Sequence, residues 1–405
     1  MTQDYDIAIV GGGLNGPTLA LAAAQSGLRV VLLDARTDQL RKNSKFDGRA
    51  YALALASKRL LTAIGIWGSV ADTAEAMLNI RVSDGRVGAG ASPIFMDFDH
   101  AEIEEGPMGY MVEDRHLRYS LQTAVQKHPE ISPHLGARVI SQTDHDAGIT
   151  LTLEGGDQIN AHLLVGADGR NSGTATRAGI RYTGWNYDQT ALVCAVTHDL
   201  PHQGVAHQFF MPPGPLAILP LTSSRSAVVW SEKTDRAALI NSLDDAAYLE
   251  VLRPRFGNFL GPIALTGGRI SYPLGLRMAQ SYIAPRVALV GDAAHGVHPI
   301  AGQGLNAGLR DIAALMHVIN AARQRGEDFT AAQVLARYQQ WRRFDATTLA
   351  LATDGANKLF SNDNACLRLG RDLGMGIINA LPGLRRNIVR EAAGLTGDLP
   401  DLMRE

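Results

Sequence analysis

The hydrophobic pattern is clearest at the start of the chain. Residues 6–10 (DIAIV) form a short apolar run ended by glycines, which is typical of a buried parallel strand. Residues 14–26 are rich in Ala and Leu and stop at Gly27, a pattern that predicts a helix with a glycine at its C-terminal end. A second apolar run at 29–33 ends at Asp34. The chain is therefore predicted to begin with a strand–helix–strand unit.

Two kinds of segment follow this unit. Strands are predicted at 163–165 and 287–290, and each runs directly into a Gly-Ala-Asp or Gly-Asp turn. After Gly304 the pattern is helical to about residue 351, and residues 353–405 form a mostly helical tail. Between the two strands lie short runs rich in Val, Phe and Trp, which predict an inserted antiparallel sheet: 190–197, 206–211, 216–219 and 227–230.

Composition and charge narrow the function. The 405 residues carry a formal net charge of −2, so no basic field attracts nucleic acid, and that class of function is excluded. Cys194 and Cys366 are the only cysteines, which predicts no disulfide framework, no metal site and a reducing, cytoplasmic setting. The N-terminus does not resemble a signal peptide, and no apolar run approaches the ~18 residues of a membrane span. Any membrane contact is therefore predicted to be peripheral; the expected location is the cytoplasm, with the inner membrane as the surface that such a contact would use.

The first motif is the glycine-rich turn Gly11-x-Gly13-x-x-Gly16, spelled GGGLNG. Its glycines permit a tight turn, close approach of a pyrophosphate to the backbone, and packing of the helix on the strand. The helix N-terminus then offers free N–H groups to the phosphates. Asp34 ends the second strand, where a carboxylate can accept hydrogen bonds from a ribose diol. Strand, turn, helix, strand and acid occur in the order of a dinucleotide-binding unit.

Two further motifs place a carboxylate at the end of a strand. Residues 166–172 spell GADGRNS and contain Asp168, while residues 291–295 spell GDAAH and contain Asp292. The second of these continues through HPIAGQGLN (298–306) into a long helix, whose N-terminus favours an anionic group. Either aspartate, taken alone, is also explained as a helix cap or turn residue. His295 and His298 flank the turn and are interpreted as positional, so no residue is assigned to acid or base catalysis.

These three motifs resemble the fingerprints of the class A flavoprotein monooxygenases, which have the para-hydroxybenzoate hydroxylase fold. Within that family, HPIAGQGLN, DGRAYALA (47–54) and VEDRHLRYSL (112–121) resemble the ubiquinone-biosynthesis hydroxylases of the UbiH, UbiF and VisC type. LFSNDN (359–364) and REAAGLTGDLP (390–400) resemble the 2-polyprenyl-6-methoxyphenol hydroxylase branch. The resemblance covers nearly the whole chain.

The resemblance implies a set of FAD contacts. The first turn would hold the pyrophosphate, Asp34 the adenosine ribose (where the family more often has glutamate), and Asp292 the ribityl chain. Asp168 would lie between FAD and a transiently bound nicotinamide. Arg49 matches an arginine near the flavin, and Arg115 matches one at the end of a helix. The full predicted set is Gly11, Gly13, Leu14, Asn15, Gly16, Asp34, Arg49, Arg115, Asp168, Gly291, Asp292, Pro299, Gly302, Gln303, Gly304, Leu305 and Asn306.

The resemblance also implies an α/β fold with a discontinuous domain structure. A Rossmann-type FAD domain is expected from residues 1–75, 101–185 and 280–350, and a β-sheet substrate domain from 76–100 and 186–279. Residues 351–405 are expected to form a helical C-terminal tail. Its stripe at 367–381, with nearby arginines, favours a membrane or partner surface about as much as packing on the protein body.

The implied activity is hydroxylation of an aromatic ring, with FAD as cofactor, NAD(P)H as transient reductant and O2 as co-substrate. A polyprenylated, lipophilic phenol of ubiquinone biosynthesis is the implied substrate, handled within a multiprotein complex or at a membrane. One alternative is a soluble hydroxylase of small aromatic acids, which would need pocket arginines. Another is a flavin-binding scaffold of a biosynthetic complex. The candidate arginines for an acid substrate are Arg225, Arg236, Arg253 and Arg255.

Overall fold

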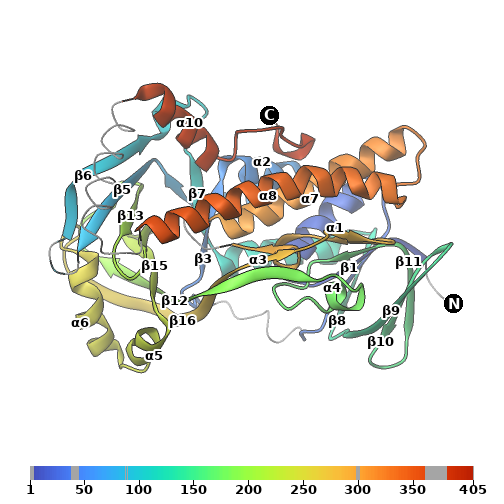
Figure 1. Ribbon diagram of the computed structural model, residues 1–405, viewed down its shortest axis with the longest axis horizontal. Helices are drawn as coiled ribbons and strands as arrows, with labels where there is room; N and C mark the ends of the chain where they lie inside the picture. Colours follow the sequence, from blue (N-terminus) through green and yellow to red (C-terminus); the bar gives the residue numbers. More distant parts are fainter. Residues whose placement is uncertain are drawn as a thin grey trace.

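A computed structural model describes residues 4–37, 45–86, 88, 90–297, 302–360 and 381–404 (Figure 1). Its first sheet has the strand order β17-β18-β11-β1-β2-β8, and β10 and β9 extend it from β11. The central pairs β1–β2, β1–β11, β2–β8 and β11–β18 are parallel. The strands are β1 (Asp4–Val10), β2 (Val30–Asp34), β8 (Ile131–Leu135), β9 (Val139–His145), β10 (Gly148–Leu153), β11 (Gln158–Gly166), β17 (Ile283–Ala284) and β18 (Val287–Leu289).

Helices pack against the parallel part of this sheet. Helix α1 is apolar on every side because both the sheet and other helices bury it, and nine of its residues, 16–24, are buried. Helices α7 and α8 run side by side over the molecule (Figure 1). The helices of this part are α1 (Asn15–Gln25), α2 (Leu55–Ala63), α3 (Asp114–Lys127), α4 (Gly173–Arg177), α7 (Gln303–Gln324) and α8 (Ala332–Phe360).

The second sheet has the order β19-β16-β12-β15-β14-β13-β5-β6. Most of its pairs are antiparallel, as predicted, but β5 and β13 pair in parallel. The two strands are far apart in the chain, so no hairpin turn fixes them as antiparallel. Helices α5 (Thr234–Asn241) and α6 (Asp245–Phe256) lie on its outer side. The strands are β5 (Asn79–Arg86), β6 (Gly90–Asp99), β12 (Tyr182–His198), β13 (Val205–Phe210), β14 (Leu216–Leu221), β15 (Arg225–Lys233), β16 (Ile263–Ala279) and β19 (His295–Gly296).

A small third sheet and several short helical turns complete the described structure. The order of the small sheet is β3-β7-β4, with antiparallel pairs. Its strands are β3 (Ala50–Ala54), β4 (Glu75–Met77) and β7 (Gly109–Glu113). The short turns are η2 (Trp67–Ser69), η3 (Ala71–Thr73), η4 (His100–Glu102), η5 (Gly291–Ala293) and η7 (Asp401–Met403).

The predicted domain limits can be compared with the bounds of the observed strands and helices. Segment 76–100 supplies β5 and β6 to the second sheet. The limit between residues 185 and 186 lies inside β12, since β12 and β16 are 17-residue strands that pair along most of their length. The limit at residue 351 lies inside α8, which continues without a break to Phe360. The division into domains stays a prediction.

The described part of the tail packs on the protein body. Helix α10 (Pro382–Ala392) places Val389 in an apolar cluster, and Ala393 and Leu395 follow it there. The Nη2 atom of Arg310 donates hydrogen bonds to the carbonyl of Gly394 (3.1 Å) and to that of Thr396 (2.7 Å). Of the two alternatives for the tail, packing on the protein body is the one that the structure supports for residues 381–404, because buried apolar contacts hold them.

Other parts of the tail prediction lie outside the described residues. The stripe at 367–380 is among these, and only its last member, Leu381, is described. Across the residues that the structure describes, no helix is both long and apolar enough to cross a bilayer.

Candidate functional site

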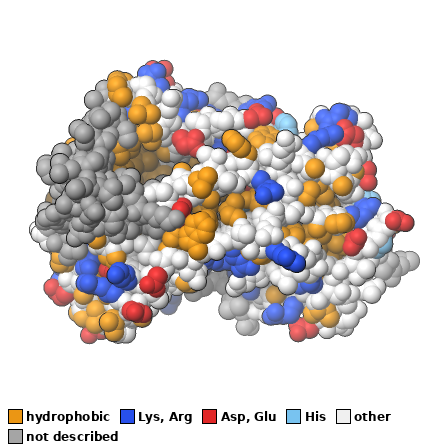
Figure 2. Space-filling model, in the orientation of Figure 1, with side chains coloured by type: hydrophobic (Ala, Val, Ile, Leu, Met, Phe, Trp, Pro, Cys, Tyr) orange, Lys and Arg blue, Asp and Glu red, His pale blue; other side chains and the backbone are white. Residues whose placement is uncertain are grey.

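One large cavity, with a volume of about 1350 Å³, lies between the first and second sheets. Its walls include the first glycine-rich turn, the turn at Asp292, the N-terminus of α7 and the inner face of the second sheet. Figure 2 shows a hollow on the surface beside α10, lined with hydrophobic side chains. From α10, Ile388 and Ala392 line the cavity. The cavity therefore joins the predicted cofactor motifs to the predicted substrate sheet.

The three glycines of the first turn have different roles. A Cβ at Gly11, where φ is +117°, would collide with the carbonyl of Ala167, and one at Gly16 would collide with the carbonyl of Gly11. These two glycines are needed because backbones approach closely. A Cβ at Gly13 would meet no atom within 4 Å, and Gly13 lines the cavity beside Leu14 and Asn15. Gly13 thus leaves space for a ligand rather than for another part of the chain.

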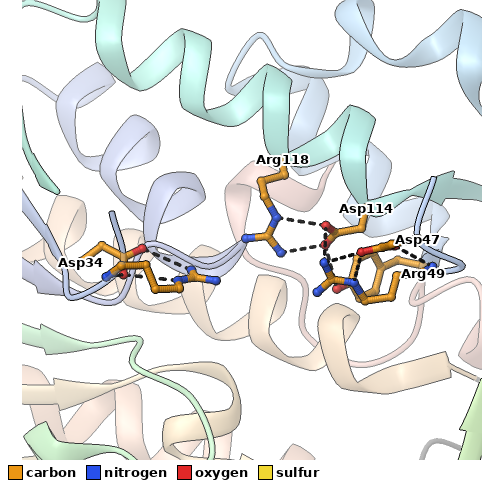
Figure 3. A network of polar contacts seen from close by, with 7 residues as sticks. Asp34, Asp47, Arg49, Asp114 and Arg118 are labelled. Carbon is orange, nitrogen blue, oxygen red and sulfur yellow. Dashed lines mark hydrogen bonds and ion pairs between the residues drawn. The ribbon is translucent and has the colours of Figure 1, made fainter. Parts of the chain in front are cut away.

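A carboxylate organises two arginines beside this turn (Figure 3). Asp114, at the start of α3, accepts hydrogen bonds from Arg118 Nε (3.0 Å) and Nη2 (2.8 Å) and from the Tyr51 hydroxyl (3.0 Å). Arg49 Nη2 lies 3.4 Å from Asp114 and 2.6 Å from Asp47. Burial alone would raise the pKa of Asp114, but the Arg118 hydrogen bonds and the two guanidinium charges lower it below its ordinary value. Asp114 is therefore ionised near neutral pH.

Arg118 lines the cavity and, within the described part of the chain, has one unpaired donor. Its Nη1 atom is buried and has no hydrogen-bond partner among the described residues, and Arg49 and Arg118 both line the cavity. Asn15 Oδ1 is also buried without a partner. Buried polar atoms in proteins are nearly always satisfied, so an unpaired guanidinium donor at the cavity wall favours an anionic ligand there. A guanidinium held by a carboxylate and a helix N-terminus suit a phosphate group.

Sequence reasoning selected Arg115 on this helix and missed Arg118. The structure pairs Arg115 Nε with Glu113 (2.7 Å), and Arg115 does not line the cavity. Arg118 lies four residues after Asp114, the spacing at which an acid and an arginine pair on a helix, and this was the available signal. A contact between Arg115 and FAD stays a prediction.

Asp34 and Asp168 lie at strand ends, as predicted, but neither lines the cavity. Asp34 accepts two hydrogen bonds from Arg36, one from its backbone N (2.9 Å) and one from its Nη2 atom (3.2 Å) (Figure 3). Both carboxylate oxygens of Asp168 are engaged in its own turn, with Ser172 Oγ (2.5 Å) and with Thr174 N (2.9 Å) and Oγ1 (3.0 Å). These contacts support the turn interpretation of Asp168, and its cofactor contact stays a prediction, as does that of Asp34.

The turn at Gly291–Ala293 places Asp292 at the cavity, and buried polar contacts with Asp311 support this turn. The Asp292 side chain is open to the cavity space but surrounded by protein, and this burial raises its pKa. Behind it, the buried carboxylate of Asp311 accepts hydrogen bonds from Gly291 N (2.9 Å) and Arg342 Nε (2.7 Å), and lies 2.6 Å from His295 Nε2. His295 therefore faces Asp311 and does not line the cavity, which supports its positional role.

The N-terminus of α7 forms the third wall. Gly302 precedes the helix with φ of +64°, a left-handed conformation that glycine tolerates, and residues 302–306 all line the cavity. The Asn306 side chain connects the helix to β3, since Oδ1 accepts from Ala54 N (2.9 Å) and Nδ2 donates to the Ala52 carbonyl (2.8 Å). A Cβ at Gly304 would meet nothing within 4 Å, so the first turn of the helix is open to a ligand. Pro299 and His298 lie outside the described residues.

These walls fit FAD in three places. Gly13 offers space and Arg118 a cationic donor to a pyrophosphate, Asp292 offers a carboxylate to a polyol, and the N-terminus of α7 offers N–H groups to an anionic ring. Within the described ranges, no group of three or more metal-ligating side chains occurs. The fold and the site together define a flavoprotein oxidoreductase whose cofactor cavity continues into an apolar chamber.

Comparisons with known proteins agree. A family model described as "FAD binding domain" matches residues 4–350. The chain is 42% identical to ubiquinone hydroxylase UbiL of Rhodospirillum rubrum, over 98% of this chain and 92% of that protein. It is 34% identical to 3-demethoxyubiquinol 3-hydroxylase of Escherichia coli, over 97% and 99% of the two chains. The chain belongs to the FAD-dependent monooxygenases of the ubiquinone-biosynthesis hydroxylase family, which use NAD(P)H and O2.

The solved structure of p-nitrophenol 4-monooxygenase PnpA from Pseudomonas putida has the same fold. It superposes with a TM-score of 0.81 at 20% identity and covers 98% of this chain and 99% of its own. This likeness confirms the predicted α/β fold, while the family model and the relatives confirm the enzyme class and the FAD cofactor. The finer assignment to the 2-polyprenyl-6-methoxyphenol hydroxylase branch stays a prediction.

Replacing Asp292 with Ala should weaken FAD binding about 10- to 100-fold, because it removes a charge-assisted hydrogen bond of about 1.5–3 kcal/mol. Since burial raises the pKa of Asp292, FAD affinity of the wild type should also fall on acidification through that pKa, and this pH dependence should vanish in the variant. Titration of apoprotein by flavin fluorescence measures both effects. Asp144→Ala, at an exposed strand position, is the control. Wild-type affinity in Asp292→Ala would show that Asp292 only shapes the turn.

Proposed function

We propose that this enzyme hydroxylates the ring of a polyprenylated phenol in ubiquinone biosynthesis. The observation that supports this most strongly is the apolar chamber on the inner face of the second sheet, which is continuous with the cofactor walls. Such a chamber suits a lipophilic ring and tail. Its apolar lining includes Met77, Ile80, Val82, Met96, Phe98, Met108, Val193, Phe210, Leu219, Val229 and Ile270.

Bound FAD supplies the acceptance of hydride from NAD(P)H and the activation of dioxygen. The chain supplies orientation and exclusion of water. Asp292 and the N-terminus of α7 would hold the cofactor at the mouth of the chamber, while Arg118 and Gly13 would hold its phosphate end. The apolar walls keep water from the reacting ring and thereby limit wasteful release of reduced oxygen. An electron-rich phenol needs little further help from acids or bases.

The chamber disfavours small aromatic acids as substrates. A carboxylate would need a cationic partner, but none of the four candidate arginines lines the cavity. Arg225 instead pairs with Glu113 (2.7 Å), and Arg255 lies 3.5 Å from Glu232. The arginines that do line the cavity, Arg49, Arg118 and Arg170, come from the cofactor side. The cavity also extends beyond the cofactor walls, which leaves room for a substrate. This room disfavours the alternative of a flavin-binding scaffold that catalyses no reaction.

The test is a reconstituted assay with FAD, NAD(P)H, dioxygen enriched in a heavy isotope, and a short-chain prenylated phenol. The expected product is the ring-hydroxylated phenol carrying one heavy oxygen atom, detected by mass spectrometry. A matched aromatic acid without the prenyl group should be turned over poorly. Consumption of NAD(P)H with no labelled product from the phenol, together with efficient labelling of the acid, would contradict the proposal.

We further propose that the substrate enters from a membrane surface or from a partner protein near α10. Leu381 and Leu384 are exposed there, and Arg386 lies beside them, while Ile388 and Ala392 of the same helix line the cavity. Arg385 and Arg390, in contrast, pair with Glu102 and Glu105 (2.7 Å each), so the positive charge is smaller than the sequence suggested. The predicted cytoplasmic and inner-membrane location stays a prediction.

Flotation with anionic phospholipid vesicles tests the membrane proposal. Leu384→Glu should reduce the floating fraction several-fold, because burying a leucine side chain contributes about 1.5–3 kcal/mol. Leu239→Glu, which alters an exposed leucine on α5, should float like the wild type. Equal flotation of all three proteins would argue against α10 as the contact, and no flotation of the wild type would favour delivery by a partner.

A further inference from the structure

A single carboxamide interrupts the apolar wall of the chamber. Gln208 lies on β13, the strand that pairs with β5 and β14. The chamber-lining residues on β5, β6, β14 and β15 are apolar without exception in the described part of the chain: Ile80, Val82, Met96, Phe98, Ala217, Leu219 and Val229. A lone amide at this position has no evident packing advantage, because an apolar side chain would fit its neighbours better.

The alternation of β13 directs Gln208 toward the chamber. Ala206 and Phe210 belong to the apolar clusters on the chamber side, and residues two apart on a strand share a face. His207 and Phe209 occupy the opposite face, where both rings lie near Phe259. Although His207 also borders the cavity, its ring lies on this opposite face. The Gln208 side chain is therefore the polar group that β13 offers to a ligand.

The hydrogen bonding of Gln208 is incomplete. Its Nε2 atom lies 3.5 Å from the Leu216 carbonyl, which is at the outer limit for a hydrogen bond. Among the described residues this is the only hydrogen bond of the Gln208 side chain, and its Oε1 atom accepts none. An amide can both donate and accept, so one face of this group is available to a bound molecule. Pockets of this kind orient an apolar ligand through a few well-placed polar groups.

We propose that Gln208 binds the phenolic hydroxyl of the substrate and thereby orients its ring. The hydroxyl donates to Gln208 Oε1, and Nε2 keeps its contact with β14. Because the lining that β5, β6, β14 and β15 supply is apolar, the hydroxyl has a preferred direction and the prenyl tail is left to these apolar surfaces. This inference rests on the proposed function, since it assumes that a phenol occupies the chamber. It makes Gln208 a residue that determines specificity for a free hydroxyl.

The experiment compares a short-chain prenylated phenol with its O-methyl ether, which lacks the hydrogen-bond donor. Dissociation constants are measured on the FAD-loaded enzyme from the change in flavin absorbance, without turnover. The wild type should prefer the phenol about tenfold, the value of one hydrogen bond of about 1 to 1.5 kcal/mol. Gln208→Leu should lower affinity for the phenol to that for the ether. Gln208→Met, an unbranched replacement of similar length, provides a second variant should the leucine disturb the strand.

Gln158→Leu, an exposed glutamine on β11, is the matched control and should keep the wild-type preference. An unchanged phenol-to-ether ratio in Gln208→Leu or in Gln208→Met would overturn the assignment. The proposed function fails separately, if the wild type does not convert the phenol to a hydroxylated product. The expected result is that the wild type hydroxylates the phenol and prefers it to the ether, and that both Gln208 variants lose this preference.

Discussion

Gly13→Val protein should be soluble and folded but colourless. A side chain at Gly13 would meet no protein atom within 4 Å, so the substitution fills the cavity without disturbing the chain around it. The space that it fills belongs to the cavity that Gly13 lines together with Asn15 and Arg118. The absorbance ratio of flavin to protein should fall to near zero, and the melting temperature of the FAD-free variant should match that of FAD-free wild type.

Two controls make this prediction sharp. Gly155→Val alters an exposed turn glycine that also has no atom within 4 Å, and this protein should remain yellow. Gly16→Val introduces a collision with the Gly11 carbonyl and should destabilise the FAD-free protein itself. Gly13→Val protein that retains full FAD would refute the location of the pyrophosphate site at this turn.

Truncation after Asp354 should yield insoluble or flavin-free protein. It would remove the buried side chains of Val389, Ala393, Leu395 and Met403, together with the part of the cavity wall that α10 supplies. At about 1.5–3 kcal/mol for each large apolar side chain, this loss approaches the 5–15 kcal/mol of stability that is typical of a whole protein. Soluble expression and flavin content measure the outcome.

Point variants in the full-length chain test the same packing without deleting a segment. Ala393→Asp puts a charge at a fully buried position and should lower the melting temperature strongly. Asn387→Asp, on the exposed side of α10, should change it little. Soluble truncated protein with wild-type FAD content would show that the tail is dispensable for the core, contrary to its observed burial.

The sequence alone was sufficient to identify the first turn, the strand ends at Asp34, Asp168 and Asp292, and the family. The reason is that these features are local. A left-handed or closely approached backbone position selects glycine wherever the rest of the chain lies, and a helix N-terminus binds anions through its own N–H groups. These features can therefore be recognised from a short stretch of sequence. The comparison with a solved structure confirmed the fold that the motifs implied.

Tertiary structure decided what depends on distant parts of the chain. Whether Arg115 or Arg118 faces the cavity depends on how α3 packs and on which carboxylate holds each guanidinium. The parallel pairing of β5 with β13, the burial of Val389 and the chamber-facing position of Gln208 likewise arise from contacts between segments more than a hundred residues apart in sequence. Such pairings are determined by the complementarity of whole surfaces, so a local residue pattern predicts the elements but not which of their faces meet.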